Sequence, residues 1–367
     1  MIAIPFYRFA TVAKCPVTSQ QTDAGERRMD LDLTEDQKAI KEVFSGFFTN
    51  EAPPTVARAA EPFGFDRSLW TRLLETGAPG MGVAETHGGG GASLGDLVVV
   101  AEAFGRAIAP VPLVEHLVAA RLFPADDVVS GESIATIALH PADADGTWRI
   151  VPAGAVADVV IGVDGAEIVA VRSAAPGTGP RNHAAAPLAD RSARIGERTV
   201  LGPAAEFSHA IAEWQTVTSG ALVGIAAQAL AIALEYVMAR QQFGVPIGSF
   251  QAIQQGMADL PILVDGGRLL TFKAAWAGDL GKPGITDAGD SNITDFEALA
   301  SMAFVFTSDG AAHATDRSLH YHGGYGFAEE YDIQLFYRRA RGWALVYDDP
   351  SREALRLAGR LFPEVNH

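Results

Sequence analysis

The order of helix-like and strand-like patterns along the chain constrains its fold more than any other feature. Residues 33–123 carry the apolar periodicity of helices, residues 126–207 break into short β-prone runs separated by Gly, Pro and Asp, and helical patterns return from residue 208 onward. A parallel-sheet α/β protein would instead alternate strands and helices throughout. The order predicts an α+β protein with an N-terminal helical domain, a small central β domain and a larger C-terminal helical domain.

Local signals within the helical blocks predict individual helices. Thr34 followed by Gln37 has the spacing of a capping box at a helix start. In the C-terminal block, residues 223–239 are apolar on nearly every side, which predicts a helix buried between other helices. Residues 259–276 and 295–320 predict two further long helices.

These patterns divide the chain into four segments. We interpret residues 1–28 as a disordered leader or an over-long gene start, because charged residues interrupt its apolar character and no cleavage site follows cleanly. We expect the N-terminal helical domain over residues 29–125, the β domain over residues 126–207 and the C-terminal helical domain over residues 208–367.

Composition disfavours several classes of function. The 367 residues include 44 acidic and 28 basic side chains, a formal charge of −16, which disfavours binding to nucleic acid or to an anionic membrane surface. The single cysteine, Cys15, excludes an intrachain disulfide and a thiolate metal cage. No stretch approaches the ~18–20 uninterrupted apolar residues of a membrane-spanning helix. We therefore expect a cytoplasmic protein whose contacts with phosphate are local.

Three segments carry distinctive motifs: residues 69–107, 239–260 and 319–341. The most specific parts are Arg240-x-x-Phe243-Gly244-x-Pro246-Ile247-x-x-Phe250-Gln251 and His322-Gly323-Gly324-Tyr325-Gly326 followed by Glu329-Glu330-Tyr331. Together with the helical–β–helical order, they resemble the acyl-CoA dehydrogenase family over residues 29–362. The resemblance implies a C-terminal four-helix bundle and flavin-dependent α,β-dehydrogenation of an acyl-CoA thioester.

The residues of these motifs suit a dinucleotide cofactor. Arg240 ends a buried helix, where a guanidinium can contact a phosphate, and glycines such as Gly323 and Gly324 let backbone amides approach an anion closely. The alternative interpretation is structural: the same pattern would arise from a capped helix, an aromatic pair in the core and an ordinary turn. The resemblance implies that Arg240, Phe243, Gln251 and the glycine turn bind the pyrophosphate and adenine of FAD, typically across a dimer interface.

The histidines before the glycine turn have two interpretations. His320 falls where the family often has a glutamine on the flavin side, so it is a candidate for a hydrogen bond to the cofactor, and a structural histidine is the alternative. His320 and His322 are two residues apart, which is not the spacing of a helical metal pair, and no carboxylate joins them at ligand spacing. We expect no metal site.

The catalytic base of the family has no direct counterpart in this chain. The dehydrogenases need a carboxylate to remove the α-proton, commonly a glutamate that follows an Arg-Asp-Ala-Lys-like run. Here the run reads Arg338-Arg339-Ala340-Arg341, and the glutamate position falls on Tyr347 without a gap or on Asp348 with one inserted residue. Asp348 is our candidate base, and a turn or N-cap residue before the last helix is the alternative.

Two neighbouring features leave alternatives open. Some relatives carry the base near the start of the buried helix, where this chain has Trp214 with Glu213 beside it, and we expect Glu213 to face another way. The arginines at 338, 339 and 341 are candidates for contact with a CoA phosphate, and paired surface charges are the alternative.

The β domain also departs from the family. The family usually supplies a Thr-Glu-Pro…Gly-Ser-Asp loop and a Trp-x-Thr/Ser segment that contact the flavin, but this chain passes from residues 138–141 almost directly to residues 150–158. Without the glutamate base and the flavin-contact segments, this chain resembles the eroded-motif subunits of actinobacterial sterol-degrading acyl-CoA dehydrogenases. Each of those subunits pairs with a more complete one. We hypothesise that this chain shares FAD and an acyl-CoA substrate with a second acyl-CoA dehydrogenase-like subunit.

Three other functions remain open on the same scaffold. The first is a homomeric dehydrogenase with Asp348 as base. The second is a non-catalytic structural or CoA-binding partner subunit. The third is a flavin oxidase or monooxygenase, because a fold does not fix a function. The sequence does not identify the acyl group.

Overall fold

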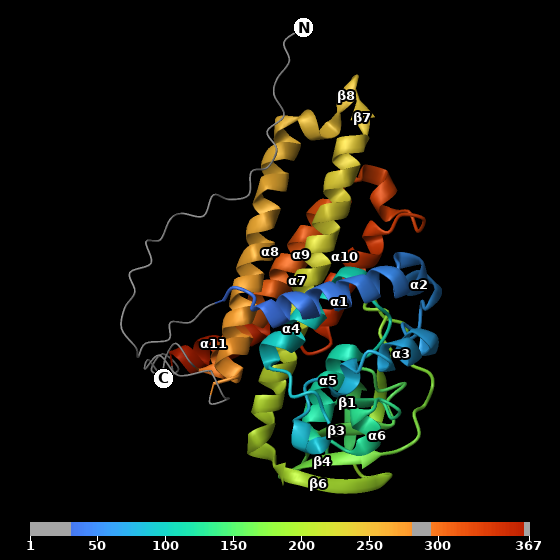
Figure 1. Ribbon diagram of the computed structural model, residues 1–367, viewed down its shortest axis with the longest axis vertical. Coiled ribbons are helices and arrows are strands. Elements are labelled where there is room, and N and C mark those ends of the chain that lie inside the picture. Colours follow the sequence, from blue (N-terminus) through green and yellow to red (C-terminus); the bar gives the residue numbers. More distant parts are fainter. Residues whose placement is uncertain (1–30, 281–294, 363–367) are drawn as a thin grey trace.

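Helices dominate the computed structural model, which describes residues 31–280 and 295–362 (Figure 1). The leader expected at residues 1–28, including Cys15, lies outside the described residues. The first helix, α1 (Glu35–Glu51), begins at the predicted capping box: Thr34 Oγ1 accepts the Gln37 N–H at 3.2 Å, and Gln37 Oε1 accepts the Thr34 N–H at the same distance.

Five further helices follow α1 before the first strand. They are α2 (Pro54–Ala59), α3 (Arg67–Leu74), α4 (Leu94–Ala107), α5 (Leu113–Leu122) and α6 (Asp126–Val129). Helix α4 is buried along most of its length and packs against both α1 and the C-terminal bundle. The N-terminal helices are therefore tied to the bundle as well as to one another.

The central segment forms two small sheets at one end of the molecule (Figure 1). The larger sheet has the order β1 (Ala135–Ile137), β3 (Val159–Asp164), β4 (Glu167–Arg172) and β6 (Glu197–Pro203). Strands β1 and β3 are parallel and the other neighbours are antiparallel. The smaller sheet pairs β2 (Thr147–Val151) with β5 (Ala189–Ser192). This segment supplies the β part of the expected α+β class.

The C-terminal segment is a bundle of α7 (Phe207–Ala239), α8 (Gln251–Gly278), α9 (Phe296–Tyr321) and α10 (Ile333–Leu345), with α11 (Pro350–Leu361) packed on α9. A short hairpin of β7 (Gln241–Gln242) and β8 (Val245–Pro246) joins α7 to α8. It lies at the opposite end of the molecule from the larger sheet (Figure 1). The predicted fold class, including the four-helix bundle, is confirmed.

Helix α7 is the central element of the core. It packs against α4, α8 and α9, and it is buried without interruption from Ala212 to Ala227, as its all-round apolar sequence predicts. The stretch Ala204–Ala239 is long and apolar enough by length and composition to cross a membrane, although Gln228 interrupts its apolar run. Because 72% of its most apolar window is buried inside the protein, it is explained as a core helix.

Candidate functional site

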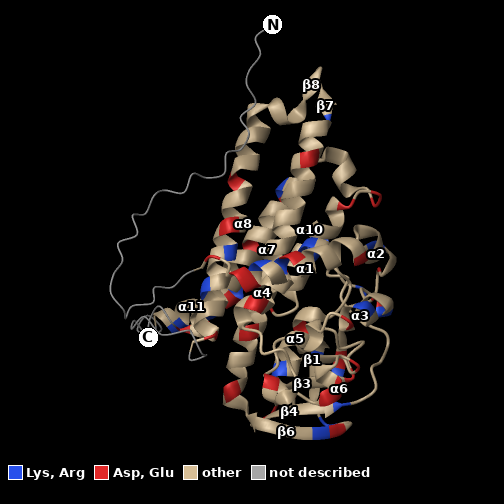
Figure 2. Ribbon diagram, in the orientation of Figure 1, with Lys and Arg blue, Asp and Glu red and all other residues tan. Residues whose placement is uncertain are grey.

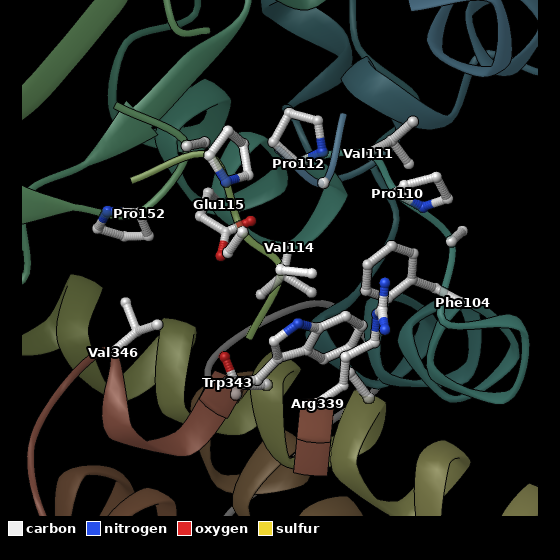
Figure 3. A pocket seen from close by; sticks show the side chains of 18 of the residues that line it. Phe104, Pro110, Val111, Pro112, Val114, Glu115, Pro152, Arg339, Trp343 and Val346 are labelled. Atoms are coloured by element: carbon white, nitrogen blue, oxygen red, sulfur yellow. The ribbon is translucent and has the colours of Figure 1, made fainter. Parts of the chain in front are cut away.

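An interior cavity of about 60 Å³ lies where the N-terminal helices, the β segment and the bundle meet (Figure 3). The segment before α5 and the start of α5 form one side, and α7 and α10 form the other. Two loops of the β segment complete the wall. The lining is mainly apolar and includes Phe104, Pro110, Val111, Pro112, Val114, Pro152, Trp343 and Val346.

Glu115 brings a carboxyl group into this apolar cavity. It lies in the first turn of α5, after Pro112 at the N-cap, where an acidic side chain favours the helix dipole. Burial raises the pKa of Glu115 to about 7, although its own backbone N–H and the nearby indole of Trp214 favour the carboxylate. Near neutral pH this side chain therefore exists in both its acidic and its ionised form.

Three other polar groups in the cavity wall are buried and have no hydrogen-bond partner. They are Nε1 of Trp214 and Oγ1 of Thr218, both on α7, and Nη2 of Arg339 on α10. The Trp214 indole faces Glu115 as a donor that lowers the pKa of its carboxyl, although the contact falls short of a well-formed hydrogen bond. Native proteins rarely leave buried polar atoms unpaired, so this grouping is typical of a site that receives a ligand or water.

The charge of Arg339 is balanced on the side away from the cavity. Its Nη1 donates to Glu61 at 2.9 Å, and Arg338 binds the same carboxylate at 2.7 Å. Burial lowers the pKa of Arg339, and Glu61 opposes this effect. Two of the three arginines considered for CoA phosphate are therefore engaged in an ion-pair network with Glu61.

Asp348, the candidate base, lies in the loop between α10 and α11 and does not line the cavity. Its carboxylate binds Arg356 at 3.0 Å and lies 3.6 Å from Arg352. Partial burial raises the pKa of Asp348, but the Asp349 N–H and Arg356 outweigh this effect and hold it below its ordinary value. The helix-capping role considered for Asp348 belongs to Asp349, whose carboxylate accepts the Ser351 N–H at the start of α11.

Tyr347, the other alignment choice, turns inward. Its ring lies 5.9 Å from both Trp214 and Phe304 and stacks on His140 at 5.4 Å. The His140 ring also approaches the backbone oxygen of Tyr347, with Nε2 at 2.6 Å. Burial, followed by the charge of Glu353, raises the pKa of the Tyr347 hydroxyl to about 12. This residue is thus a packing group at physiological pH, not a proton acceptor.

Glu213 faces away from the cavity, as expected. It forms a bidentate ion pair with Arg121 at 2.6 and 2.9 Å. Burial by itself would raise its pKa, but His209 and Arg121 hold the pKa at about 2. A carboxylate this firmly ionised and paired is a structural anchor between α5 and α7.

The predicted cofactor residues gather at the end of the bundle that carries the β7–β8 hairpin. Arg240 caps the C-terminus of α7, and its guanidinium lies over the Tyr325 ring at 5.6 Å. Phe243 is 94% exposed and meets the Phe250 ring edge-on at 6.2 Å. Gln251 is the first residue of α8. The structure therefore brings Arg240 beside the glycine turn and leaves an exposed aromatic ring nearby.

The glycine turn itself is open. Gly323 has φ of +59°, and a Cβ added at Gly323 or Gly324 would meet nothing within 4 Å. His320 is exposed in the last turn of α9, just before it. Among the described residues Arg240 forms no ion pair, so its charge is available to an anion. These groups fit the pyrophosphate and adenine of a dinucleotide, and they lie on an exposed surface.

Sequence reasoning missed Glu115 as a site residue. Its local signal is a carboxylate in the mainly apolar run Leu113–Leu122, directly after two prolines. That pattern marks a buried acid, but it does not reveal that α7 and α10 place unpaired donors beside it. No group of three metal-ligating side chains lies together within the part of the chain that the structure describes.

Comparisons with known proteins place the chain in a family. Residues 34–123 match the acyl-CoA dehydrogenase N-terminal domain and residues 210–346 match the C-terminal domain. "Acyl-CoA dehydrogenase IpdE2" of Mycobacterium tuberculosis is 30% identical over 348 residues, covering 90% of this chain and 98% of that protein. Its namesake from Mycolicibacterium smegmatis is 28% identical over 340 residues, covering 90% of this chain and 100% of that protein.

Solved structures agree with this placement. A variant of the "Tcur3481-Tcur3483 steroid ACAD" superposes with a TM-score of 0.78 at 26% identity, covering 91% of this chain and 99% of that one. The "ChsE4-ChsE5 complex from Mycobacterium tuberculosis" has the same TM-score at 23% identity, covering 92% and 99%, and supports the fold. The chain belongs to the acyl-CoA dehydrogenase family, which confirms the resemblance and the expected enzyme class, an oxidoreductase acting on acyl-CoA thioesters.

Proposed function

We propose that this chain is one subunit of a cytoplasmic, hetero-oligomeric acyl-CoA dehydrogenase and shares FAD with a second subunit of the same family. The observation that carries the proposal is the open, exposed placement of the residues that suit the cofactor, at the hairpin end of the bundle. Two relatives of known structure, the Tcur3481–Tcur3483 protein and the ChsE4–ChsE5 complex, are named as pairs of different chains. A partner would cover the exposed surface and complete the cofactor site.

The exposed surface at this end is apolar as well as open. Figure 2 shows few charged residues along the ribbon of the β7–β8 hairpin and the start of α8. Large apolar side chains are exposed there and on the neighbouring glycine turn: Met238, Phe243, Val245, Phe250, Tyr325 and Phe327. Exposed apolar groups gathered in this way are typical of a protein–protein interface. The occupant that we propose is the second acyl-CoA dehydrogenase-like subunit.

In the assembled site, FAD would accept the hydride from the β-carbon of the acyl group. Arg240 would bind the pyrophosphate together with the backbone amides at Gly323 and Gly324. Phe243 would offer a ring face to the adenine, and Gln251 both a donor and an acceptor. We assign His320 a hydrogen bond on the flavin side.

The base that removes the α-proton is the least complete part of the site. Asp348 can act only after it leaves Arg356, since the ion pair favours the carboxylate and so weakens it as a proton acceptor. We therefore propose that the partner supplies the base. Asp348→Asn should leave the rate of flavin reduction by acyl-CoA within about threefold of the wild type, because this partly exposed ion pair is worth only about 1 kcal/mol and does not take part in the reaction. Abolished reduction with retained flavin would instead identify Asp348 as the base.

The visible spectrum of the purified protein tests the proposal directly. The chain should be colourless or only partly loaded with flavin when produced alone, and fully yellow when co-produced with a neighbouring homologue. Titration with acyl-CoA thioesters of different sizes should then bleach the flavin of the complex. A fully yellow and active homo-oligomer without a partner would contradict the proposal.

A non-catalytic role for this subunit is the second candidate. The packed ring of Tyr347 and the paired carboxylate of Asp348 favour it, because neither alignment choice presents a free base. Equilibrium dialysis distinguishes the two functions. A complex that binds no FAD at this subunit would support the structural or CoA-binding role.

A further inference from the structure

His116, on α5, is fully buried at the joint between the N-terminal helices and the β segment, and it does not line the interior cavity. Its ring has a backbone partner on each side. Nε2 lies 3.0 Å from the oxygen of Val128 at the end of α6, and Nδ1 accepts the N–H of Ala135 at the start of β1, also at 3.0 Å. One side chain therefore joins α5 to both α6 and β1.

The two contacts fix where the ring carries its hydrogen. A carbonyl oxygen only accepts and a backbone N–H only donates, so Nε2 of His116 carries the hydrogen and Nδ1 carries none. A second proton, on Nδ1, would point at the Ala135 N–H and break that contact. The arrangement therefore holds only for the neutral ring.

The surroundings of the ring do not favour a positive charge. The Trp70 ring of α3 meets His116 edge-on at 5.1 Å, and its indole N–H donates to the Gly131 oxygen at 3.0 Å. Burial lowers the pKa of His116 to about 4, although the Val128 carbonyl opposes this effect. A protonated ring here would be a buried cation, and within the described chain no carboxylate is bonded to it.

The charged groups on the neighbouring elements are engaged elsewhere or exposed. They are Arg67 over the Phe65 ring and Arg72 with Glu51 on α3, Arg121 of α5 with Glu213 of α7, Asp127 of α6 with Arg172, Asp158 with the Ile134 N–H beside β1, and the exposed Asp126 and Glu132. Glu115, the preceding residue on α5, faces the interior cavity (Figure 3). Proton binding at His116 is therefore governed by its own burial and its two backbone contacts.

We propose that His116 is an acid-sensitive latch: protonation of its ring releases α5 from α6 and β1 and loosens the joint between the N-terminal helices and the β segment. The interior cavity has walls on both sides of this joint, namely the start of α5 and two loops of the β segment. The latch keeps these walls together at neutral pH and lets them separate in acid. It belongs to the fold of this chain and does not depend on the proposed function.

Glu115 acts in the opposite direction and masks the latch. Opening of the joint would hydrate both side chains and return them to their ordinary pKa values, 4.5 for Glu115 and 6.5 for His116. Between these values the proton that His116 gains on opening is matched by the one that Glu115 loses. The wild type should therefore open with little dependence on pH in this range, and Glu115→Gln should reveal the latch.

Hydrogen exchange at the Ala135 amide measures the opening, because this N–H is the one bonded to His116. In Glu115→Gln, the equilibrium constant for opening, corrected for the intrinsic exchange rate, should rise by about five- to tenfold from pH 6 to pH 5. Adding His116→Asn should increase opening equally at both pH values, because the amide keeps an acceptor and binds no proton. Adding His87→Gln instead is the matched control: His87 is exposed, and the full rise should remain.

The imidazole signals of the full-length chain, labelled at histidine, give a second readout that needs no change at His116. At pH 5, where a histidine with the ordinary pKa of about 6.5 is charged, His116 should still be neutral with its hydrogen on Nε2. An imidazole that titrates with the ordinary pKa, or opening of Glu115→Gln that is equal at pH 6 and pH 5, would overturn the latch. Neither readout involves flavin or the partner subunit, so the proposed function would stand in either case.

Discussion

Glu115 and Glu213 are both enclosed near the start of α7, yet they favour opposite charge states. Glu115 faces apolar side chains, and burial raises its pKa to about 7. Burial also acts on Glu213, but His209 and Arg121 overcome it and hold the pKa at about 2. The difference lies in the partners, since a buried carboxyl without a cation is driven toward its neutral form. Glu213 can therefore anchor the fold, while Glu115 can hold or release a proton.

The stability of the protein should fall with rising pH because of Glu115. Its pKa is raised from the ordinary value of 4.5 to about 7, so between these values the folded chain binds the proton more tightly than the unfolded chain. The free energy of unfolding then decreases across this window by up to about 3 kcal/mol. Glu115→Gln removes this contribution, and its stability relative to the wild type should increase from about pH 5 to about pH 8.

Urea unfolding at the two pH values measures this difference. Arg339, across the cavity and paired with Glu61, is the other charged residue that lines the cavity in the described chain. Glu132→Gln, at an exposed carboxyl, is the control and should track the wild type at both pH values. A constant offset between Glu115→Gln and the wild type would show that Glu115 does not titrate in this window.

At the scale of elements, local sequence signals predicted where the helices lie along the chain, but they predicted poorly how the elements pack together. The capping box at Thr34 depends on residues three apart, and the burial of α7 follows from its own apolar surface. In the β segment the β-prone runs at residues 134–139, 148–151, 157–163 and 167–171 predicted β1 to β4, but β5 and β6 were missed. Most residues of β6 are exposed, and its apolar residues Val200 and Leu201 are adjacent, so the strand lacks apolar alternation.

The site was predicted only where its residues lie close together in sequence. The FAD motif at 240–251 and the glycine turn at 323–326 each form a compact unit, which a chain pattern can reveal. The cavity joins α5, α7 and α10, which lie about a hundred residues apart in turn, and only packing brings them together. Tyr347 and Asp348 are adjacent, and a single inserted residue in the alignment decides which of them takes the glutamate position. Counting residues cannot show which of the two side chains faces inward.

The close crossing of α4 and α7 gives a prediction for these two elements. A Cβ at Gly105 would lie 1.9 Å from the backbone oxygen of Ala221, so the helices must separate if the glycine is replaced. Gly105→Ala should destabilise the protein by about 1–3 kcal/mol or more. Gly46→Ala is the control, because Gly46 lies in α1 with nothing within 4 Å of an added Cβ.

Chemical denaturation of the two variants should show opposite signs. Gly46→Ala should stabilise the chain by about 0.5–1 kcal/mol, because alanine loses less backbone entropy in a helix. If Gly105→Ala were as stable as Gly46→Ala, α4 and α7 would not be in the close contact described here.

At the scale of the whole molecule, the cavity and the predicted cofactor residues occupy separate regions. The cavity lies at the junction of the three segments, whereas Arg240 and the glycine turn lie at the far, hairpin end of the bundle. A flavin bound to the hairpin end of this chain would therefore lie far from this chain's own cavity and would instead face the cavity of another subunit. Because the net charge is −16, the pyrophosphate binding that we propose would depend on local contacts with Arg240 and backbone amides.

The proposed assembly depends on the exposed rings at the hairpin end, so Phe243 provides its sharpest test. Phe243→Ala should weaken binding of the partner subunit by about 30-fold, the effect of losing an aromatic anchor worth about 2 kcal/mol. The isolated chain should keep its stability, because Phe243 is 94% exposed in it and contributes little to its core. Ile195→Ala is the matched control: Ile195 is 74% exposed on the β segment, at the other end of the molecule.

Size-exclusion chromatography with light scattering, on the two chains mixed at decreasing concentration, measures this affinity. The Phe243→Ala complex should dissociate at concentrations where the wild-type and Ile195→Ala complexes stay intact, and its flavin should dissociate with it. Because the cofactor is proposed to lie between the subunits, loss of the partner and loss of the flavin must occur together. An intact complex that loses only the flavin would show that Phe243 contacts the adenine and contributes nothing to the subunit interface. Weaker assembly with full flavin retention would mean that one subunit holds FAD by itself, and the flavin absorbance of the separated chains would show which one.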